Sequence, residues 1–190
     1  AVLLTSQQLH AYAITSYLEM VTVSAVGGAW KNVPLSNSYT DPVIACTYNL
    51  PSTADNEAVV RVQKAGSGFQ IKAQRPVNSF AVTASNVHCT ISESGAYTYP
   101  IKYEAHTIIS DTTNHNGDWT AASMENISAA PYKLQNYSQP VVIGQVMSYN
   151  NAHFSTFWSS RCSTRSAPPS NSAICVGKHT SQVIPNTPNT

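Results

Sequence analysis

Charge is the property that this sequence lacks most. Only ten of its 190 residues are Lys or Arg and nine are Asp or Glu, so charged residues make up 10% of the chain. Ordinary soluble domains carry about a quarter. The formal net charge is +1, and the lysines are scattered without forming a basic stripe. This pattern argues against nucleic acid and against an anionic membrane surface as partners.

Long apolar runs, a leader and known catalytic motifs are also missing. No run approaches the roughly 20 apolar residues that cross a bilayer, so we predict no membrane insertion. The chain opens at Ala1-Val-Leu-Leu4, without Met or a charged leader, which we interpret as a mature end left by removal of a signal peptide. No G-x-S-x-G, H-E-x-x-H or Walker pattern occurs, and this absence predicts a protein without catalysis.

The scattered titratable residues offer few candidate sites. Glu104 and His106 are two positions apart, so on a strand they share a face and could share a proton or a metal ion. One carboxylate and one imidazole are a small part of a metal site, which favours a solvated strand pair. The loop Asn114–Asp118 has oxygen ligands and a turn Gly but lacks the full calcium-loop pattern, so we interpret it as a turn. We therefore predict no metal site, no cofactor and no enzyme.

Four cysteines occur, and their setting favours disulfides. None lies in a C-x-x-C pair, so a zinc site is not favoured. With so little charge and so many hydroxyl and amide side chains, we expect an oxidising compartment and two disulfides. Four buried thiols in a cytosolic protein are the alternative. The cysteines are Cys46, Cys89, Cys162 and Cys175.

Alternation with a period of two dominates the chain. Phe69, Ile71 and Ala73 alternate with polar neighbours, as expected for a strand with one buried and one wet face. Residues 6–18 fit a helix or, given their Tyr and Thr content, a strand. Many short strands with frequent turn signals predict an all-β, antiparallel β-sandwich fold. The other predicted strands are 19–24, 29–35, 42–49, 58–64, 86–93, 100–110, 140–148, 154–159 and 172–177.

A weak internal repeat divides the chain. Leu35–Ala45 resembles Leu134–Gly144, and each continues into a series of similar strands. The first copy has a fourth strand at 86–93, whereas the second ends in a Pro-rich tail that cannot form a central strand. We predict an N-terminal segment (1–18), a first sandwich unit (19–99) and a second unit (100–190) that lacks its last strand. Chance similarity between Tyr- and Pro-rich strands is the alternative.

The repeat also predicts how the cysteines pair. Cys46 follows the strand that begins at Pro42, and Cys89 lies on the inward face of the fourth strand of the same copy, which favours a Cys46–Cys89 disulfide. Cys162 and Cys175 bracket a Pro-rich loop in the second copy. Closing this loop would contribute about 3 kcal/mol in the chain-entropy model.

Several spacings in the first copy carry a family resemblance. They are Trp30, Tyr39-Thr-Asp-Pro42, Asp55-Asn56, Arg61-Val-Gln-Lys64, Gly68-Phe69 and the strand Val87–Glu93. This pattern resembles an H-type lectin domain, which implies a six-stranded antiparallel sandwich, often trimeric, that binds simple sugars. Where that family has a sugar-contacting Trp, this chain has Gln74-Arg75-Pro76. The second copy resembles modules repeated in large bacterial surface proteins, through Val142–Asn150, Phe157–Ser160 and Ala173–His179.

Polar planar side chains beside aromatic rings are what sugar recognition requires. Tyr48 or Tyr97 could stack on a sugar ring. Arg61 is notable because it interrupts an otherwise apolar strand. An ordinary wet sheet face is the alternative. The candidate sugar ligands are Asp55, Asn56, Arg61, Arg75, Asn86 and His88.

The missing strand points to assembly. A unit that is one strand short has an open edge, whose N–H and C=O groups invite another chain. Tyr12, Ile14, Tyr17 and Leu18 of the N-terminal segment could fill that edge in a neighbouring copy, and head-to-tail donation builds a filament. We predict a non-enzymatic, self-assembling extracellular subunit on a bacterial surface, whose partners are its own copies. A lectin-like module that binds glycans is the alternative.

Overall fold

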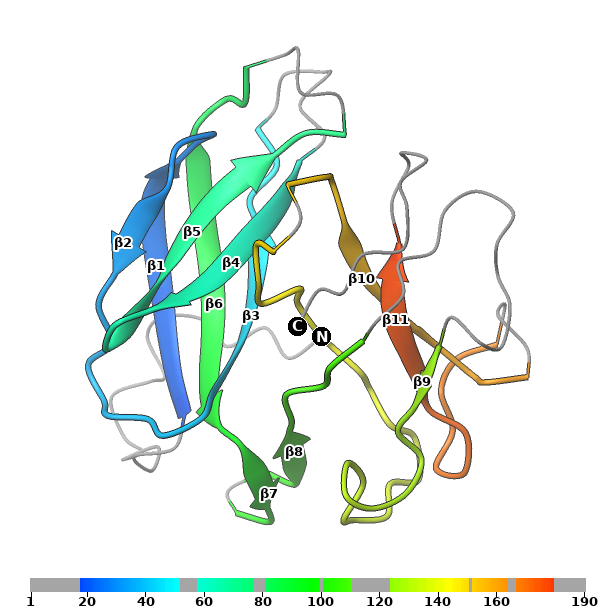
Figure 1. The fold of residues 1–190 in the computed structure, drawn as a ribbon. Helices are drawn as coiled ribbons and strands as arrows, with labels where there is room; N and C mark the ends of the chain where they lie inside the picture. Colours follow the sequence, from blue (N-terminus) through cyan, green and yellow to red (C-terminus); the bar gives the residue numbers. More distant parts are fainter. Residues whose placement is uncertain are drawn as a thin grey trace.

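The fold is all-β with antiparallel sheets (Figure 1). The computed structural model describes residues 18–51, 58–76, 81–99, 101–110, 124–150, 152–163 and 167–179. Within these ranges no helix occurs, and thus none that is long and apolar enough to cross a membrane. The strands are β1 (Leu18–Val26), β2 (Lys31–Val33), β3 (Pro42–Tyr48), β4 (Val59–Ala65), β5 (Gly68–Gln74), β6 (Ser85–Glu93), β7 (Gly95–Tyr97), β8 (Tyr103–Ala105), β9 (Glu125–Asn126), β10 (Thr156–Ser160) and β11 (Cys175–His179).

The first six strands form one β-sandwich. One sheet has the strand order β1-β6-β3 and the other β2-β5-β4, and Figure 1 shows the two sheets face to face. The alternating apolar residues predicted from the sequence fill the space between them, with Ile71, Val87 and Ile91 fully buried. Six antiparallel strands are the number that the resemblance to H-type lectins implies. The strand count alone does not distinguish that family from other sandwiches.

Both predicted disulfides are present. Cys46 and Cys89 face each other in the register of β3 and β6, with their Cα atoms 4.1 Å apart. A narrow pair of this kind, without backbone hydrogen bonds, brings two side chains close across an antiparallel ladder. Cys162 bonds to Cys175 across the β10–β11 connection. The described cysteines therefore include no free thiol.

The N-terminal strand corrects one assembly residue. Leu18, predicted to belong to the donated segment, is the first residue of β1 and pairs with Ser92 of β6 in its own chain. Leu18 pairs within its own chain because the alternating pattern of β1 already begins at this residue. Tyr12, Ile14 and Tyr17, together with most of the helix-or-strand segment 6–18, lie outside the described residues.

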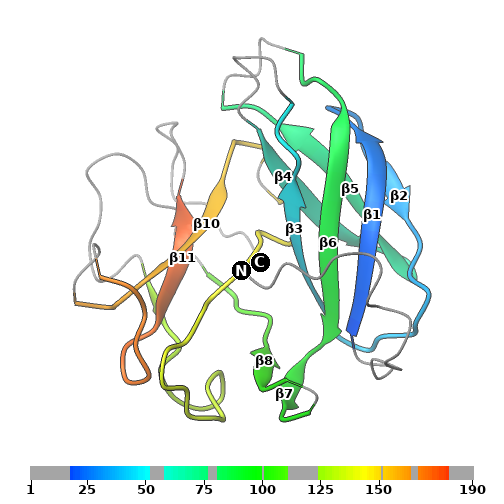
Figure 2. The ribbon, with the colours of Figure 1, turned by 180° about the vertical axis from the view of Figure 1, so that it is seen from behind.

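Part of the predicted second unit, residues 100–190, lies within the described ranges. Three of its described strands form a sheet with the order β10-β11-β9, and a fourth, β8, pairs with β7. The predicted strand 100–110 shortens to β8. Residues 140–148 form no strand, and we call residues 140–150 the crossing segment because they run from the second half onto the sandwich (Figure 2). The strand prediction fails here because no described strand pairs with the backbone of this segment, and its polar contacts go instead to β3 and β4 through side chains.

Gly144 allows the crossing segment to approach the sheet formed by β10, β11 and β9. A Cβ atom added at this position would lie 2.5 Å from the ring of Phe157 on β10. We expect Gly144→Ala to destabilise the protein by about 1–3 kcal/mol, the usual range for overpacking a tight site. Urea unfolding followed by tryptophan fluorescence would measure the change.

Gly28→Ala is the matched control for this substitution, because a Cβ at Gly28 meets no atom within 4 Å. Its stability should stay within about 1 kcal/mol of the parent protein. Equal stability of the two variants would show that the crossing segment does not rest on Phe157.

Candidate functional site: Arg61 and the crossing segment

Arg61 is the largest fully buried side chain among the described residues. Its neighbours Val60 and Val62 point into the sandwich core, so the alternation of β4 turns Arg61 to the outer face of its sheet. That face is covered by the crossing segment and the residues that follow it. The guanidinium donates from Nη1 to Gln74 Oε1 at 2.9 Å and to the carbonyl of His153 at 2.5 Å, and from Nη2 to the carbonyl of Ser148 at 3.3 Å.

Aromatic rings complete the surroundings of this charge. The guanidinium carbon lies 4.9 Å from the centre of the Tyr149 ring. Lys72 approaches the same ring to 4.0 Å and donates to the Tyr149 hydroxyl at 2.8 Å, while Trp30 packs edge-on against it with centroids 5.0 Å apart. Burial lowers the pKa of the Arg61 guanidinium, but an arginine remains protonated in proteins. Carbonyl dipoles and ring faces therefore stabilise a buried cation here.

Further contacts attach the crossing segment to β3 and β4, which are edge strands of the two sandwich sheets. We call the line between these two strands the seam. Gln145 donates to the carbonyl of Val60 on β4 at 2.7 Å, and the backbone N–H of Ile44 on β3 donates to Met147 Sδ at 3.4 Å. Side chains of the second half thus satisfy outward-facing groups of two edge strands. Unpaired edges attract other chains, so this segment protects the sandwich.

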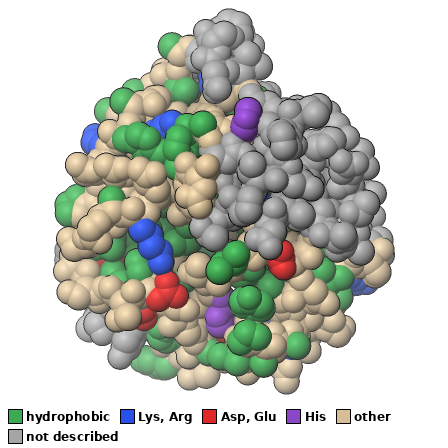
Figure 3. All heavy atoms as spheres, viewed as in Figure 1, with side chains coloured by type: hydrophobic (Ala, Val, Ile, Leu, Met, Phe, Trp, Pro, Cys, Tyr) green, Lys and Arg blue, Asp and Glu red, His purple; other side chains and the backbone are tan. Residues whose placement is uncertain are grey.

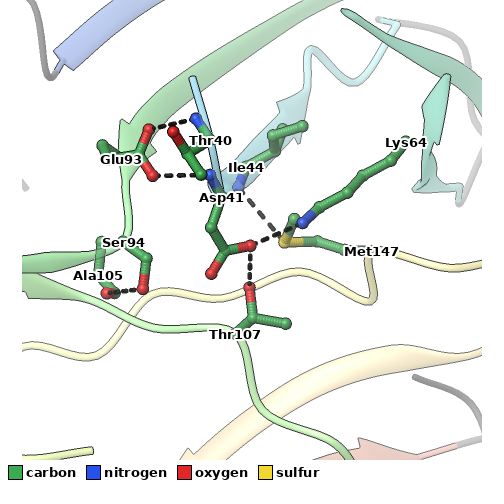
Figure 4. Close-up of polar contacts among 9 residues, drawn as sticks. All are labelled: Thr40, Asp41, Ile44, Lys64, Glu93, Ser94, Ala105, Thr107 and Met147. Atoms are coloured by element: carbon green, nitrogen blue, oxygen red, sulfur yellow. Dashed lines mark hydrogen bonds and ion pairs between the residues drawn. The ribbon is translucent and has the colours of Figure 1, made fainter. Parts of the chain in front are cut away.

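Asp41 joins the two strands at one end of this seam, where β3 begins and β4 ends (Figure 4). Its carboxylate accepts from Lys64 at 2.8 Å and from Thr107 at 3.5 Å. Glu93 accepts hydrogen bonds from the backbone N–H groups of Thr40 and Asp41, each at 2.7 Å. The start of β3, the end of β4 and the chain after β8 are therefore joined at one point.

A hollow opens beside the cluster formed by Arg61 and its neighbours Gln74, Tyr149, Lys72 and Trp30. Its volume is about 320 Å³, and its lining contains two cationic side chains, Lys72 and Arg75, and no carboxylate. Tyr149 and Gln74 also line the hollow, and the Gln74 amide accepts from Arg61 and donates to the carbonyl of Ala152. Such a surface favours ligands that carry hydroxyl or carboxylate groups.

The predicted sugar ligands do not form one group. Arg61 is buried and holds the crossing segment, so its guanidinium does not face solvent as a sugar contact requires. Arg75 lines the hollow, whereas Asn86 and His88 lie exposed on β6 in the other sheet, where His88 contacts the Thr22 hydroxyl at 3.0 Å. Asp55 and Asn56 lie outside the described residues.

Neither predicted stacking tyrosine lies at the hollow. The Tyr48 hydroxyl donates to the carbonyl of Thr83, and the Tyr97 ring stacks on Tyr103 with centroids 4.7 Å apart. The aromatic residue that lines the hollow, Tyr149, comes from the second half of the chain, and Trp30 of the first half packs against its ring. Residues so far apart could not be matched from the sequence alone, although the position of Arg61 in an apolar strand was a signal of the cluster.

Glu104 and His106 share a face, as predicted, but they are not a solvated pair. Their side chains lie 3.2 Å apart, and that of Glu104 is only 7% exposed. Glu104 accepts from the backbone N–H groups of Leu134 at 2.6 Å and Gln135 at 2.9 Å. No third His, Cys, Asp or Glu joins them to form a metal-binding group in the described part of the chain. The loop Asn114–Asp118 lies outside that part.

Glu104 thus accepts hydrogen bonds from two consecutive backbone N–H groups, a contact that we call a clamp. The same clamp occurs in the first half of the chain. Glu19 on β1 accepts from the backbone N–H groups of Ser36 and Asn37. These amides lie three and two residues before Tyr39, which contacts Glu19 at 3.4 Å and is followed three residues later by Pro42. The amides bound by Glu104 lie three and two residues before Tyr137, and Pro140 follows three residues after it. The weak sequence repeat therefore coincides with a repeated contact.

The Glu104 clamp predicts a loss of stability in acid. Burial by itself would raise the pKa of Glu104, but hydrogen bonds from Leu134, His106, Tyr137 and Gln135 outweigh burial and lower the pKa below its usual value of 4.5. A lowered pKa in the folded state gives stability that is present above pH 4.5 and disappears as the pH falls through the lowered value.

We therefore expect Glu104→Gln to flatten the acid side of the stability curve. Urea unfolding of both proteins between pH 7 and pH 3 would measure it. Curves that stay parallel over this range would contradict the proposed role of the carboxylate.

Comparison with known protein families, with curated proteins and with solved structures finds no match. The arguments on function that follow therefore rest on the geometry of this chain.

Proposed function

We propose that this protein is a non-enzymatic, extracellular structural subunit that assembles with copies of itself by β-strand complementation on a bacterial surface. The supporting observation is apolar exposure outside the sandwich. Val141 is 82% exposed and Ile143 72%, and four further large apolar side chains are more than half exposed. These four are Tyr99, Ile101, Ile109 and Leu134.

This exposure is unevenly distributed. Among the described residues of the sandwich strands and loops, only Met20 and Leu50 are comparable. Figure 3 shows hydrophobic side chains gathered on the lower part of the visible face, near the β7–β8 hairpin. Exposed apolar groups of this kind mark surfaces that are covered in an assembly. Two disulfides favour an oxidising compartment, which supports an extracellular location.

The carboxylates support a structural role over catalysis. Glu19, Glu93 and Glu104 each accept two consecutive backbone N–H groups. A carboxylate committed to holding a loop is not positioned to exchange protons with a substrate.

The test is the oligomeric state of the full chain and of a variant lacking residues 1–17. Light scattering and negative-stain electron microscopy should show filaments or large oligomers for the full chain and a monomer for the truncated one. Disulfide mapping would establish that the truncated chain is folded. A full chain that stays monomeric at its highest soluble concentration, or a truncated chain that assembles equally well, would refute the proposal.

The hollow at Lys72 and Arg75 favours a second candidate function, the binding of carbohydrate. Two cationic side chains without a carboxylate beside them suit a saccharide that carries carboxylate groups. A glycan array with neutral and acidic saccharides is the direct test. Binding should be lost in Lys72→Ala and kept in Lys31→Ala, because Lys31 lies on β2 and donates to the carbonyl of Ser24. A silent array with the fold intact would remove this candidate.

A further inference from the structure

The sheet of the second half repeats one sheet of the first. In the first half, β5 lies between β2 and β4, and all pairs are antiparallel. In the second half, β11 lies between β9 and β10, again antiparallel. The order along the chain is also the same, because a short outer strand comes first and a hairpin supplies the other two strands. The second half therefore contains a counterpart of β2-β5-β4.

Two segments stand where the other sheet of the first half has its outer strands. β1 carries Glu19, and its counterpart is β8, which carries Glu104 in the same clamp. β3 begins at Pro42, and its counterpart is the start of the crossing segment at Pro140. Each segment also faces the matching strand of the opposite sheet. The chain after β8 contacts β11 through Lys178, which donates to the carbonyl of Ser110 at 2.8 Å, and Gly144 lies against Phe157 of β10.

What the described residues do not supply is a counterpart of β6. In the first half β6 is the central strand of its sheet and pairs with β1 on one side and β3 on the other. In the second half the described residues show no strand pairing between residues 103–110 and 140–144. The internal repeat predicts that the second copy lacks this fourth strand, and in the described part of the chain the lack falls in the middle of a sheet.

We propose that this position is an acceptor site for the N-terminal segment of a second copy of this chain, inserted between residues 103–110 and 140–144 as β6 is inserted between β1 and β3. This inference rests on the proposed assembly function and names its acceptor. The lack of a central neighbour accounts for the exposure of Val141 and Ile143, because side chains of an unpaired strand lose the lateral cover of the next strand.

The chemistry of the N-terminal segment suits this site. Residues 1–17 contain no Asp, Glu, Lys or Arg. Tyr12 and Ile14 share a face in an extended chain, as the buried Val87 and Cys89 do in β6. An uncharged, alternating segment can pair on both edges without burying a charge.

Chain length favours donation between copies over folding back. If Tyr12 and Ile14 occupy the acceptor site, only four Cα–Cα steps join Ile14 to Leu18 of β1, and they span at most about 14 Å. β1 is the outer strand of the order β1-β6-β3, so two strand spacings, about 10 Å, separate it from β3. The second half lies beyond β3, on the side away from β1 (Figure 2). Donation to a neighbouring copy is free of this limit, which favours it over folding back.

Photo-cross-linking of the full chain tests this assignment. A photoreactive phenylalanine analogue replaces Ile143, which tolerates the change because it is exposed, and unlabelled chains are mixed with ¹⁵N-labelled chains before assembly. We expect cross-links from position 143 to residues 1–17 that join a light and a heavy chain. The same probe at Leu50, also exposed but in the sandwich, should give none.

Other outcomes overturn the assignment. Cross-links within one chain only would mean that the segment folds back, and cross-links to another part of the chain would mean a different occupant. An assembly that forms without cross-links from position 143 would refute the acceptor site and leave the proposed function standing. A chain that remains monomeric would refute both.

A peptide competition separates insertion from simple edge addition. A synthetic peptide of residues 1–17 should inhibit assembly of the full chain. N-methylation blocks backbone donors, and alternate residues of a strand donate to opposite edges. Methylation at Tyr12 and Ile14, or at Ala13 and Thr15, should each weaken inhibition at least tenfold, because an inserted strand pairs on both edges. Loss in only one of the two peptides would indicate edge addition and overturn the proposal.

Discussion

Arg61→Ala should destabilise the protein by about 3–5 kcal/mol, mainly by releasing the crossing segment. The substitution removes the donor from Gln74 and from the backbone carbonyls of Ser148 and His153, at about 1–3 kcal/mol for each buried acceptor left unsatisfied. It also leaves a cavity where the largest fully buried side chain stood. Urea unfolding would give the loss of stability. Hydrogen exchange should show faster exchange in residues 145–150 than in β5 and β6.

Two substitutions control for charge and for the loss of an arginine. Arg61→Lys keeps the cation but loses the planar fork, so only part of the stability should return. Arg161→Ala removes an exposed arginine and should change stability by less than about 0.5 kcal/mol. A loss below about 1 kcal/mol in Arg61→Ala, with exchange unchanged in the crossing segment, would show that Arg61 does not hold the two halves together.

Removing the Cys46–Cys89 disulfide should cost about 4 kcal/mol. The bond closes a loop with a sequence separation of 43, and the chain-entropy model assigns about 4 kcal/mol to a loop of that length. The bond also joins a central strand to an edge strand beside the core. The double variant Cys46→Ala, Cys89→Ala should therefore unfold at a clearly lower urea concentration than the parent protein.

The second disulfide provides the comparison. Cys162 and Cys175 are separated by 13 positions, for which the same model gives about 3 kcal/mol. Their double alanine variant should be the more stable of the two. The reverse order would mean that the denatured chain already holds β3 and β6 together, so that cross-linking them restricts it little.

Local sequence was sufficient to predict a strand where one face of that strand packs against the core. The alternation of Phe69, Ile71 and Ala73 predicted β5, and similar patterns predicted β1, β3, β4 and β6 to within two residues. The disulfide pairs followed from placing Cys46 and Cys89 in one repeat. Residues 140–148 show the limit of this reasoning. Their alternation indicates an extended backbone, but a strand exists only where another strand pairs with it.

The candidate site depended on contacts that no local pattern contains. The sequence marked Arg61 as unusual and assigned it to a sugar, because a charge on the outer face of a sheet is normally wet. Its burial was decided by Ser148 and His153, which lie 87 and 92 positions further along the chain. Glu104 was likewise expected to be solvated, and Leu134 and Gln135 enclose it.

The sequence by itself therefore determined the all-β class, the two disulfides and which residues alternate, because side-chain periodicity and cysteine spacing are local properties. Only the tertiary structure decided which outer face is covered, that the crossing segment lies along the edges of β3 and β4, and that the strand without a counterpart in the described residues is a central one. The physical reason is that a β-strand presents two faces and two edges. The sequence specifies which face is apolar, whereas the partner at each edge and the cover over the second face come from residues far away along the chain.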